Sequence, residues 1–198
     1  SPAAVAGCFF TGLANSGFWT LAPLYGKGAW LSASEIAPFL TIAVLGGAAS
    51  QWPIGYFSDK FGRRSLLTIV AIAACLAGIG LYMVSRGSLD QLYLFALLYG
   101  TMAFPVYTLC VAHANDLVHK KRAVEVSSGL LLTFSIGAVI GPIVASFAMS
   151  WLGHGALFLH SALAHGLIAV VMLVRAQMRP VPPKQRSEGY VVVPRTTP

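Results

Sequence analysis

The chain has 198 residues, of which 57% are hydrophobic and only 10% are charged, and its formal net charge at pH 7 is +7. Soluble domains carry about 25% charged residues, so this composition excludes an ordinary water-soluble domain and favours a protein that spans a membrane several times. The apolar runs are continuous and do not alternate with a period of two residues, which favours spanning helices over a transmembrane barrel.

Six apolar runs follow one another along the chain. They cover residues 4–25, 34–57, 66–84, 92–112, 124–150 and 155–174. Each is close to about 20 residues, the length at which an α-helix crosses about 30 Å of hydrocarbon. We therefore predict an all-α membrane protein with six transmembrane helices in residues 1–175. Residues 176–198 are rich in proline and polar side chains, which predicts a disordered cytoplasmic tail.

Local signals add detail to these helices. Ser32 and Glu35 stand where the second helix is expected to begin, because a helix N-terminus favours a capping hydroxyl and an anion. Pro105 and Pro142 fall inside the fourth and fifth runs and are expected to bend or loosen those helices. Small residues four positions apart predict close packing between helices. These pairs are Gly46 and Ser50, Ala73 and Ala77, Ala74 and Gly78, and Gly137 and Gly141.

The first two residues, Ser1 and Pro2, include neither a methionine nor a basic segment. A secretory signal peptide needs a basic segment before its apolar core, so we predict no signal peptide here. We interpret this start as a cut within a longer protein.

A short charged segment separates the second and third runs. It reads GYFSDKFGRR and covers residues 55–64, and four of its ten residues are charged. Because a charge at the bilayer centre is costly, this 55–64 loop must lie at a membrane surface. The loop is too short to form a domain, so we expect it to hold two neighbouring helices in a fixed relation.

Lysine and arginine are distributed unequally between the two sides of the predicted bundle. One side holds Lys27 and Arg86. The other side holds the remaining eleven: Lys60, Arg63, Arg64, Lys120, Lys121, Arg122, Arg175, Arg179, Lys184, Arg186 and Arg195. Positively charged loops stay in the cytoplasm, so the second side and both termini are predicted to be cytoplasmic. Membrane topology thus explains the basic composition better than nucleic-acid binding does.

The 55–64 loop resembles the signature loop of the major facilitator superfamily. The family pattern G-x-x-x-D-[RK]-x-G-R-[RK] is matched at all its specified positions, which are Gly55, Asp59, Lys60, Gly62, Arg63 and Arg64. The resemblance implies that this loop latches one conformation of a transporter and is released when the transporter switches. The residues themselves indicate a tight turn at Gly62 and a helix that ends close to a neighbour at Gly55. The alternative is a surface cluster of ion pairs, which contributes little to stability.

Two further resemblances concern longer stretches. The fifth run, with Gly129, Gly137, Gly141 and Pro142, resembles antiporter-type members of the superfamily, although the first glycine spacing is one residue short. Packing alone also explains this pattern. The whole chain resembles the C-terminal six-helix half of a bacterial branch of the superfamily. The segments that carry this resemblance are PLYGKG (23–28), ASQWPIG (49–55), AHANDLV (112–118) and VEVSSGLLL (124–132). The family fold has two such halves, so one half is expected here.

In that family the first and fourth helices of each half line the central cavity. By this resemblance, the candidate cavity residues are Asn15, Trp19, Thr20, Tyr99, Thr101 and Tyr107, with Ser16 and Phe104 beside them. Polar side chains are costly in lipid, so they should face protein or water. Hydrogen bonding and packing between helices are the alternative for each of them.

The titratable residues limit the chemistry that the chain can perform. None of the six acidic residues lies in the middle of a predicted helix, so a proton-coupled mechanism would use His113, His160 or His165 as a relay, or a residue of the other half of the transporter. These histidines are otherwise packing residues. The chain has no phosphate-binding Gly-Lys-Ser/Thr loop and no cluster at metal-ligand spacing, so we predict no enzyme, no cofactor and no metal site. The cysteines Cys8, Cys75 and Cys110 lie singly inside apolar runs and indicate packing.

These observations predict secondary active transport of a small solute across the cytoplasmic (inner) membrane by alternating access. The expected partners are the solute, a coupling proton or ion, the lipid bilayer, and either an N-terminal half or a second copy of this chain. Nucleic acid is not expected. The alternatives are a non-transporting membrane scaffold or interaction module, and a half-transporter that acts as a homodimer.

Overall fold

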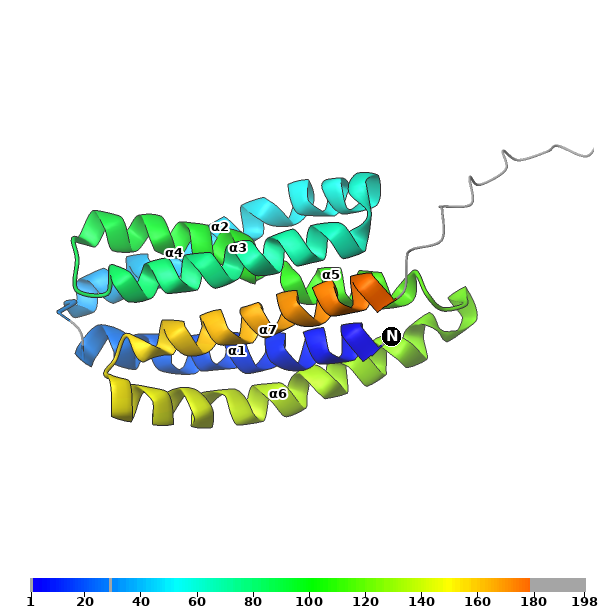
Figure 1. Ribbon diagram of the computed structural model, residues 1–198. Coiled ribbons are helices and arrows are strands. Elements are labelled where there is room, and N and C mark those ends of the chain that lie inside the picture. Colours follow the sequence, from blue (N-terminus) through cyan, green and yellow to red (C-terminus); the bar gives the residue numbers. More distant parts are fainter. Residues whose placement is uncertain (1, 29, 179–198) are drawn as a thin grey trace, which may run out of the picture.

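The computed structural model describes residues 2–28 and 30–178, and the regular secondary structure in this part of the chain is all helical. In chain order the helices are α1 (Pro2–Gly28), α2 (Ala33–Phe61), α3 (Arg63–Met83), α4 (Leu89–Ala103), α5 (Val106–Asn115), the short 3-10 helix η1 (Lys120–Arg122), α6 (Ala123–Leu152) and α7 (Ala156–Met178). The helices run side by side along one axis (Figure 1).

Each predicted apolar run forms a helical segment, which confirms the all-α membrane fold. The fourth segment is divided into α4 and α5 at Phe104 and Pro105, as the proline predicts. Pro142 lies inside α6, which continues through it as one helix, and the expected bend or loosening there stays a prediction. The predicted tail was to begin at residue 176, whereas α7 extends to Met178 and the rest of the tail lies outside the described residues.

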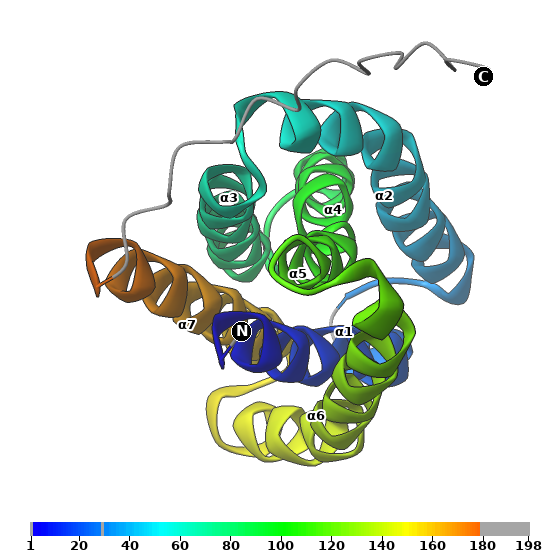
Figure 2. The same ribbon diagram turned by 90° about the vertical axis from the view of Figure 1, so that its right-hand side faces the viewer.

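Within the described residues, five helical segments are long and apolar enough to cross a membrane. They are α2, α3, the α4–α5 pair, α6 and α7. Helix α1 is not among them, because Gly, Ser, Thr and Asn lower its hydropathy. It nevertheless runs the length of the bundle between α6 and α7 (Figures 1 and 2), so we count it as the sixth segment.

The six segments form two layers. Helix α1 packs most extensively against α6, and α2 packs most extensively against α4. Helices α1 and α5 are also in contact, which gives a front layer in the order α6, α1, α4–α5, α2. Helices α7 and α3 pack against each other and lie behind α1 and α4, so they form the back layer. The end-on view shows α5 close to the middle of this arrangement (Figure 2).

Small residues make the close approaches between these helices. A methyl group on Gly137 of α6 would meet the backbone of Phe9 in α1, and one on Gly12 of α1 would meet the backbone of Phe134 in α6. Gly46 of α2 faces Leu97 of α4 in the same way. The prediction that small residues mark helix contacts is therefore confirmed for these positions.

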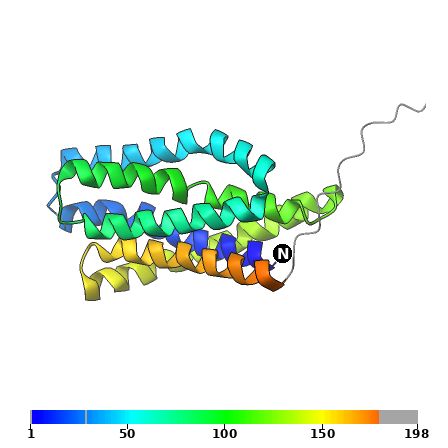
Figure 3. The same cartoon turned by 45° about the horizontal axis from the view of Figure 1, so that its top comes forward.

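The helix connections divide between two ends of the bundle. The N-terminus, the turn between α2 and α3, the connection from α5 to α6 and the end of α7 lie at one end (Figures 1 and 3). We call it the basic end, because these segments carry Lys60, Arg63, Arg64, Lys121, Arg122 and Arg175. Lys27 and Arg86 belong to the connections at the opposite end. The unequal distribution of Lys and Arg predicted from the sequence thus corresponds to the two ends of the bundle.

Candidate functional site

The 55–64 loop consists almost entirely of helix. Helix α2 ends at Phe61 and α3 begins at Arg63, so Gly62 alone makes the turn between them. Its φ of 93° lies in the region that residues with a Cβ avoid. A glycine is therefore required here, as the sequence predicts, and the chain reverses direction within one residue.

Arg63 connects this turn to helix α5. Its guanidinium donates from Nη2 to Asp59 Oδ1 at 2.9 Å and lies 3.1 Å from Asp116 Oδ2 through Nε. Asp59 is in the last turns of α2 and Asp116 directly follows α5. Arg63 is the least exposed of the three side chains, at 28%, compared with 70% for Asp59 and 51% for Asp116. One arginine thus ties the ends of three helices together.

A recess of about 280 Å³ lies beside this ion-pair network, between α2 and α5. Its lining includes Gln51, Gly55, Ser58, Asp59 and Thr108. The Ser58 side chain is buried, and its Oγ makes no hydrogen bond to the described residues. We expected Gly55 to lie close to a neighbouring helix, but no heavy atom lies within 4 Å of the position that a Cβ would take. Gly55 therefore faces open space in this chain.

The remaining residues of the loop pattern lie at the surface of the basic end. Lys60 is exposed, and its Nζ lies 5.6 Å from the centre of the Tyr56 ring. Arg64 is half-buried in the first turn of α3. A separate pair, Arg122 and Glu125, joins residues three apart through two hydrogen bonds of 3.1 Å. These bonds raise the pKa of the Arg122 guanidinium, but both partners are exposed and the pair connects no two bundle helices.

The predicted cavity residues are only partly brought together on the front layer. Asn15 is half-buried and Trp19 and Thr20 are exposed on α1. Trp19 stacks on Phe104 at the α4–α5 break, with ring centres 5.3 Å apart and an interplanar angle of 27°. Tyr107 is half-buried and packs edge-on against Phe134 of α6 at 4.8 Å. Trp19 thus contacts the α4–α5 break, and Tyr107 contacts α6.

Two of the predicted cavity residues contact neighbouring helices. Tyr99 is fully buried, and its hydroxyl is hydrogen-bonded to Ser161 of α7 behind the front layer. Thr101 donates a hydrogen bond of 2.7 Å to the carbonyl oxygen of Leu97 and lies close to Gly46 of α2. Both side chains therefore lie close to neighbouring helices, and their assignment to the cavity stays a prediction.

The three histidines lie in two separate places. His113 is half-buried in α5 near the basic end. His160 and His165 are buried in α7, where His165 Nδ1 lies 2.8 Å from the carbonyl oxygen of Ser161. His160 packs beside Gly17 of α1, and neither of its ring nitrogens has a hydrogen-bond partner in the described part of the chain. His113 therefore lies apart from His160 and His165, and a role for any of them in proton coupling stays a prediction.

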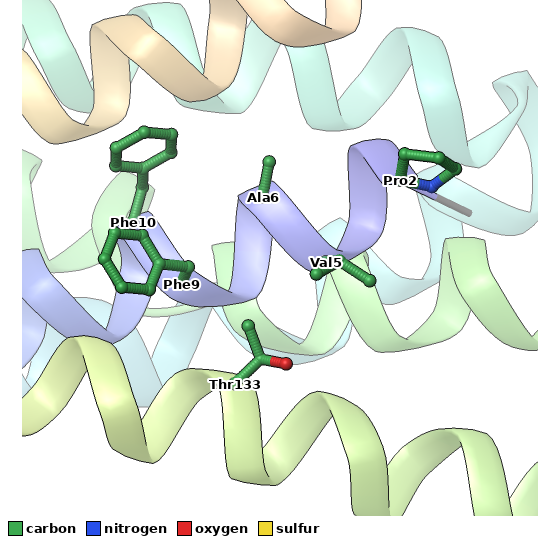
Figure 4. Close-up of a pocket in the computed structure, with 6 residues that line it drawn as sticks. All are labelled: Pro2, Val5, Ala6, Phe9, Phe10 and Thr133. Carbon is green, nitrogen blue, oxygen red and sulfur yellow. The ribbon is translucent and has the colours of Figure 1, made fainter.

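A second recess, of about 730 Å³, lies between α1 and α6 toward the basic end. Its lining is almost wholly apolar, with Val5, Phe9 and Phe10 from α1 and Thr133 from α6 (Figure 4). Over residues 2–28 and 30–178, no group of three or more His, Cys, Asp or Glu side chains is placed to hold a metal ion. The site therefore offers binding surfaces and ion pairs, with no assembled metal ligands in the described residues.

Sequence reasoning missed Asp116, the third member of the ion-pair network. The available signal was an acidic residue at the end of the fourth run, on the same side of the membrane as the 55–64 loop. It also missed the hydrogen bond between Tyr99 and Ser161 and the bond of 3.2 Å from Asn115 to Ser127. No local pattern indicates these contacts, because they join different helices.

Comparisons with known proteins agree with this arrangement. The family model described as Major Facilitator Superfamily matches residues 4–196. The similar proteins include the Uncharacterized MFS-type transporter Ent638_1421 of Enterobacter sp. (strain 638), 29% identical over 181 residues, which are 90% of this chain and 45% of that protein. The Uncharacterized MFS-type transporter YcaD of Salmonella newport (strain SL254) is 28% identical over 178 residues, with the same coverage. The chain therefore spans about half the length of the curated relatives that it matches.

Proposed function

The chain belongs to the major facilitator superfamily, and from this premise we propose that it forms the C-terminal half of a secondary transporter that moves a small solute by alternating access. Membership implies membrane transport and points to a transporter rather than an enzyme. The relatives are about twice as long as this chain, which supports a second half of similar size as its partner.

The observation that carries this proposal is the ion-pair network of the 55–64 loop. Arg63 contacts Asp59 and Asp116, so it links the α2–α3 turn to the end of α5. A half-bundle that rocks against its partner needs such a rigid end. The open space at Gly55 leaves room for a helix of the other half to approach this network. Loss of the contact between that helix and the ion-pair network would release the latch.

The front layer is the proposed surface for the solute and the second half. Helices α2 and α6 are the least buried of the five apolar segments and stand at the two edges of this layer. Asn15 and Trp19 are four residues apart on one face of α1 and would line the central pathway. Back-layer helices α3 and α7 would face lipid. This division supports the assignment of α1 and α4–α5 to the cavity.

We place the basic end in the cytoplasm of a cell with an inner membrane. The excess of Lys and Arg at this end supports that orientation, because positively charged connections are retained on the cytoplasmic side. The first residues of α1 and the end of α7 then lie on the cytoplasmic side too. Histidines are the intramembrane groups suited to a coupling proton, of which His160 and His165 are the most deeply buried.

The experiment uses the product of the complete reading frame that encodes this chain, called the full-length protein below. A thermal-shift screen first identifies a solute, since a bound ligand raises the unfolding temperature. This solute is then loaded into proteoliposomes that contain the protein. We expect Asp59→Asn to lower solute flux severalfold while the unfolding temperature stays within a few degrees. The matched control is Glu125→Gln, which removes an exposed ion pair outside the network. Equal flux in the wild type and the Asp59 variant would refute the latch.

A further inference from the structure

An exposed tryptophan lies in the second half of α1, inside the helix and away from the connections at the ends of the bundle. Trp19 is 46% exposed. Its ring is fixed by two contacts, because it stacks on Phe104 and meets Phe18 edge-on with ring centres 5.4 Å apart. Phe104 is fixed in turn, since any side chain at Gly47 of α2 would occupy its place. The indole face is thus held rigidly while part of it stays uncovered.

Further aromatic rings extend this surface. Tyr107 lies one turn after Phe104 on α5, and its ring packs against Phe134 of α6. We call Trp19, Phe104, Tyr107 and Phe134 the aromatic platform. Its members come from α1, the α4–α5 break, α5 and α6, so it crosses the front layer. Rigid aromatic rings bind flat molecules with little loss of conformational entropy.

Polar atoms without partners lie next to the platform. Asn15 is one helical turn before Trp19, on the same face of α1. The Asn15 Oδ1 atom is buried and makes no hydrogen bond within the described residues, and the same holds for Ser16 Oγ, which lies against Gly141 of α6. A buried polar atom without a partner is costly and rare, so it marks a place where a ligand or water supplies the bond. Asn15 can accept a hydrogen bond there through its amide oxygen.

Charge is absent from this surface. Among the described residues, the acidic and basic side chains of α1, α4, α5 and α6 lie at or near helix ends: Lys27, Asp90, Asp116 and Glu125. A solute with a carboxylate or phosphate would find no cation to pair with beside Trp19. A positive charge is accepted more easily, because the face of an indole ring attracts cations.

From this combination we infer that the aromatic platform is a solute subsite for planar aromatic molecules that carry no negative charge, with Trp19 stacking on the ring and Asn15 accepting a hydrogen bond. The inference rests on the proposed transport function and names its substrate class. A sugar also stacks on tryptophan, but its many hydroxyl groups need more polar partners than Asn15, Ser16 and Thr20 provide. The platform therefore selects flat, sparsely polar solutes.

The test measures binding of three probes to the full-length protein in nanodiscs, with empty nanodiscs subtracted. Proflavine is a planar tricyclic cation, anthracene carboxylate is a tricyclic anion, and glucose is a neutral sugar. We expect saturable binding of proflavine and none of the other two. Trp19→Ala should weaken proflavine binding roughly tenfold, as expected for the loss of one stacking contact, while Trp19→Phe should weaken it less than threefold.

The matched control is Trp52→Ala. Trp52 is 81% exposed on α2 and lies outside the platform, so its loss should leave proflavine binding unchanged. If Trp19→Ala fails to fold, Trp19→Phe and Asn15→Ala carry the test, and Asn15→Ala should weaken binding at least threefold. Preferential binding of the anion or the sugar, or equal effects of Trp19→Ala and Trp52→Ala, would overturn the inference. These results leave the transport proposal standing if Asp59→Asn still lowers flux of a screened solute.

Discussion

Replacing Gly137 with alanine should separate α1 from α6, the most extensively packed helix pair in the bundle. An added methyl group would meet the carbonyl oxygen of Phe9 and lie 3.1 Å from the backbone nitrogen of Leu13. Backbone atoms cannot move aside as a flexible side chain can, so the two helices must part by a fraction of an ångström or more. Overpacking of this kind costs about 1–3 kcal/mol.

Gly129, two turns earlier on α6, provides the matched control. No heavy atom lies within 4 Å of the position that its Cβ would take. Alanine at this exposed site should therefore keep its helix-propensity advantage of about 1 kcal/mol and meet no neighbour. The two substitutions are chemically identical and share the same gain in helix propensity, so their difference of about 1–3 kcal/mol isolates the effect of the α1–α6 contact.

The assay is reversible unfolding of the full-length protein in mixed micelles, followed by tryptophan fluorescence. The free energy of unfolding should fall for Gly137→Ala and stay level or rise for Gly129→Ala. An equal change in the two variants would refute the reasoning, because it would mean that α1 and α6 do not approach closely at Gly137. A stabilising Gly137→Ala would refute it as well.

Two further substitutions test contacts between helices. Asp116→Asn removes one ion pair of Arg63 and should lower the free energy of unfolding by up to about 1 kcal/mol. Glu125→Gln should change this free energy less, because both members of its ion pair are exposed. An equal loss for the two variants in denaturant titrations would contradict the role of Asp116. Tyr99→Phe removes a buried hydrogen bond to α7 and should lower the free energy of unfolding by about 1–2 kcal/mol. Tyr82→Phe, at an exposed ring, should leave the free energy of unfolding unchanged. Equal unfolding temperatures of the two variants would show that the buried bond is not formed.

Much of the fold follows from local physical signals. The length of each apolar run predicts a spanning helix, and Pro105 predicts the break between α4 and α5, because it lacks the N–H that a continuous helix needs. Ser32 and Glu35 predict the start of α2, where the backbone N–H of Ser32 donates to Glu35 at 2.7 Å. Gly62 predicts the one-residue turn through its freedom to adopt a positive φ.

Other features depend on neighbours that the sequence does not reveal. Tyr99 is polar and lies in the fourth run, which indicates the cavity, yet its helix turns it toward α7. Pro142 leaves α6 unbroken, while Pro105 divides its helix. Asp116 reads as an ordinary acid at a helix end, and only the fold brings it 3.1 Å from Arg63. In each case the deciding contact lies between helices that are distant in the chain.

The most direct test of the central claim is the accessibility of a single cysteine at Trp19, which is 46% exposed and stacks on Phe104 of the α4–α5 break in the front layer. The full-length protein, with Cys8, Cys75 and Cys110 replaced, is treated with a membrane-impermeant maleimide in right-side-out and in inverted vesicles. Alternating access predicts labelling from both sides, with a ratio that Asp59→Asn changes at least threefold. Leu76→Cys, on the exposed face of the back-layer helix α3, is the lipid-facing control. If Trp19→Cys is as unreactive as that control in both kinds of vesicle, the front layer lines no solute pathway.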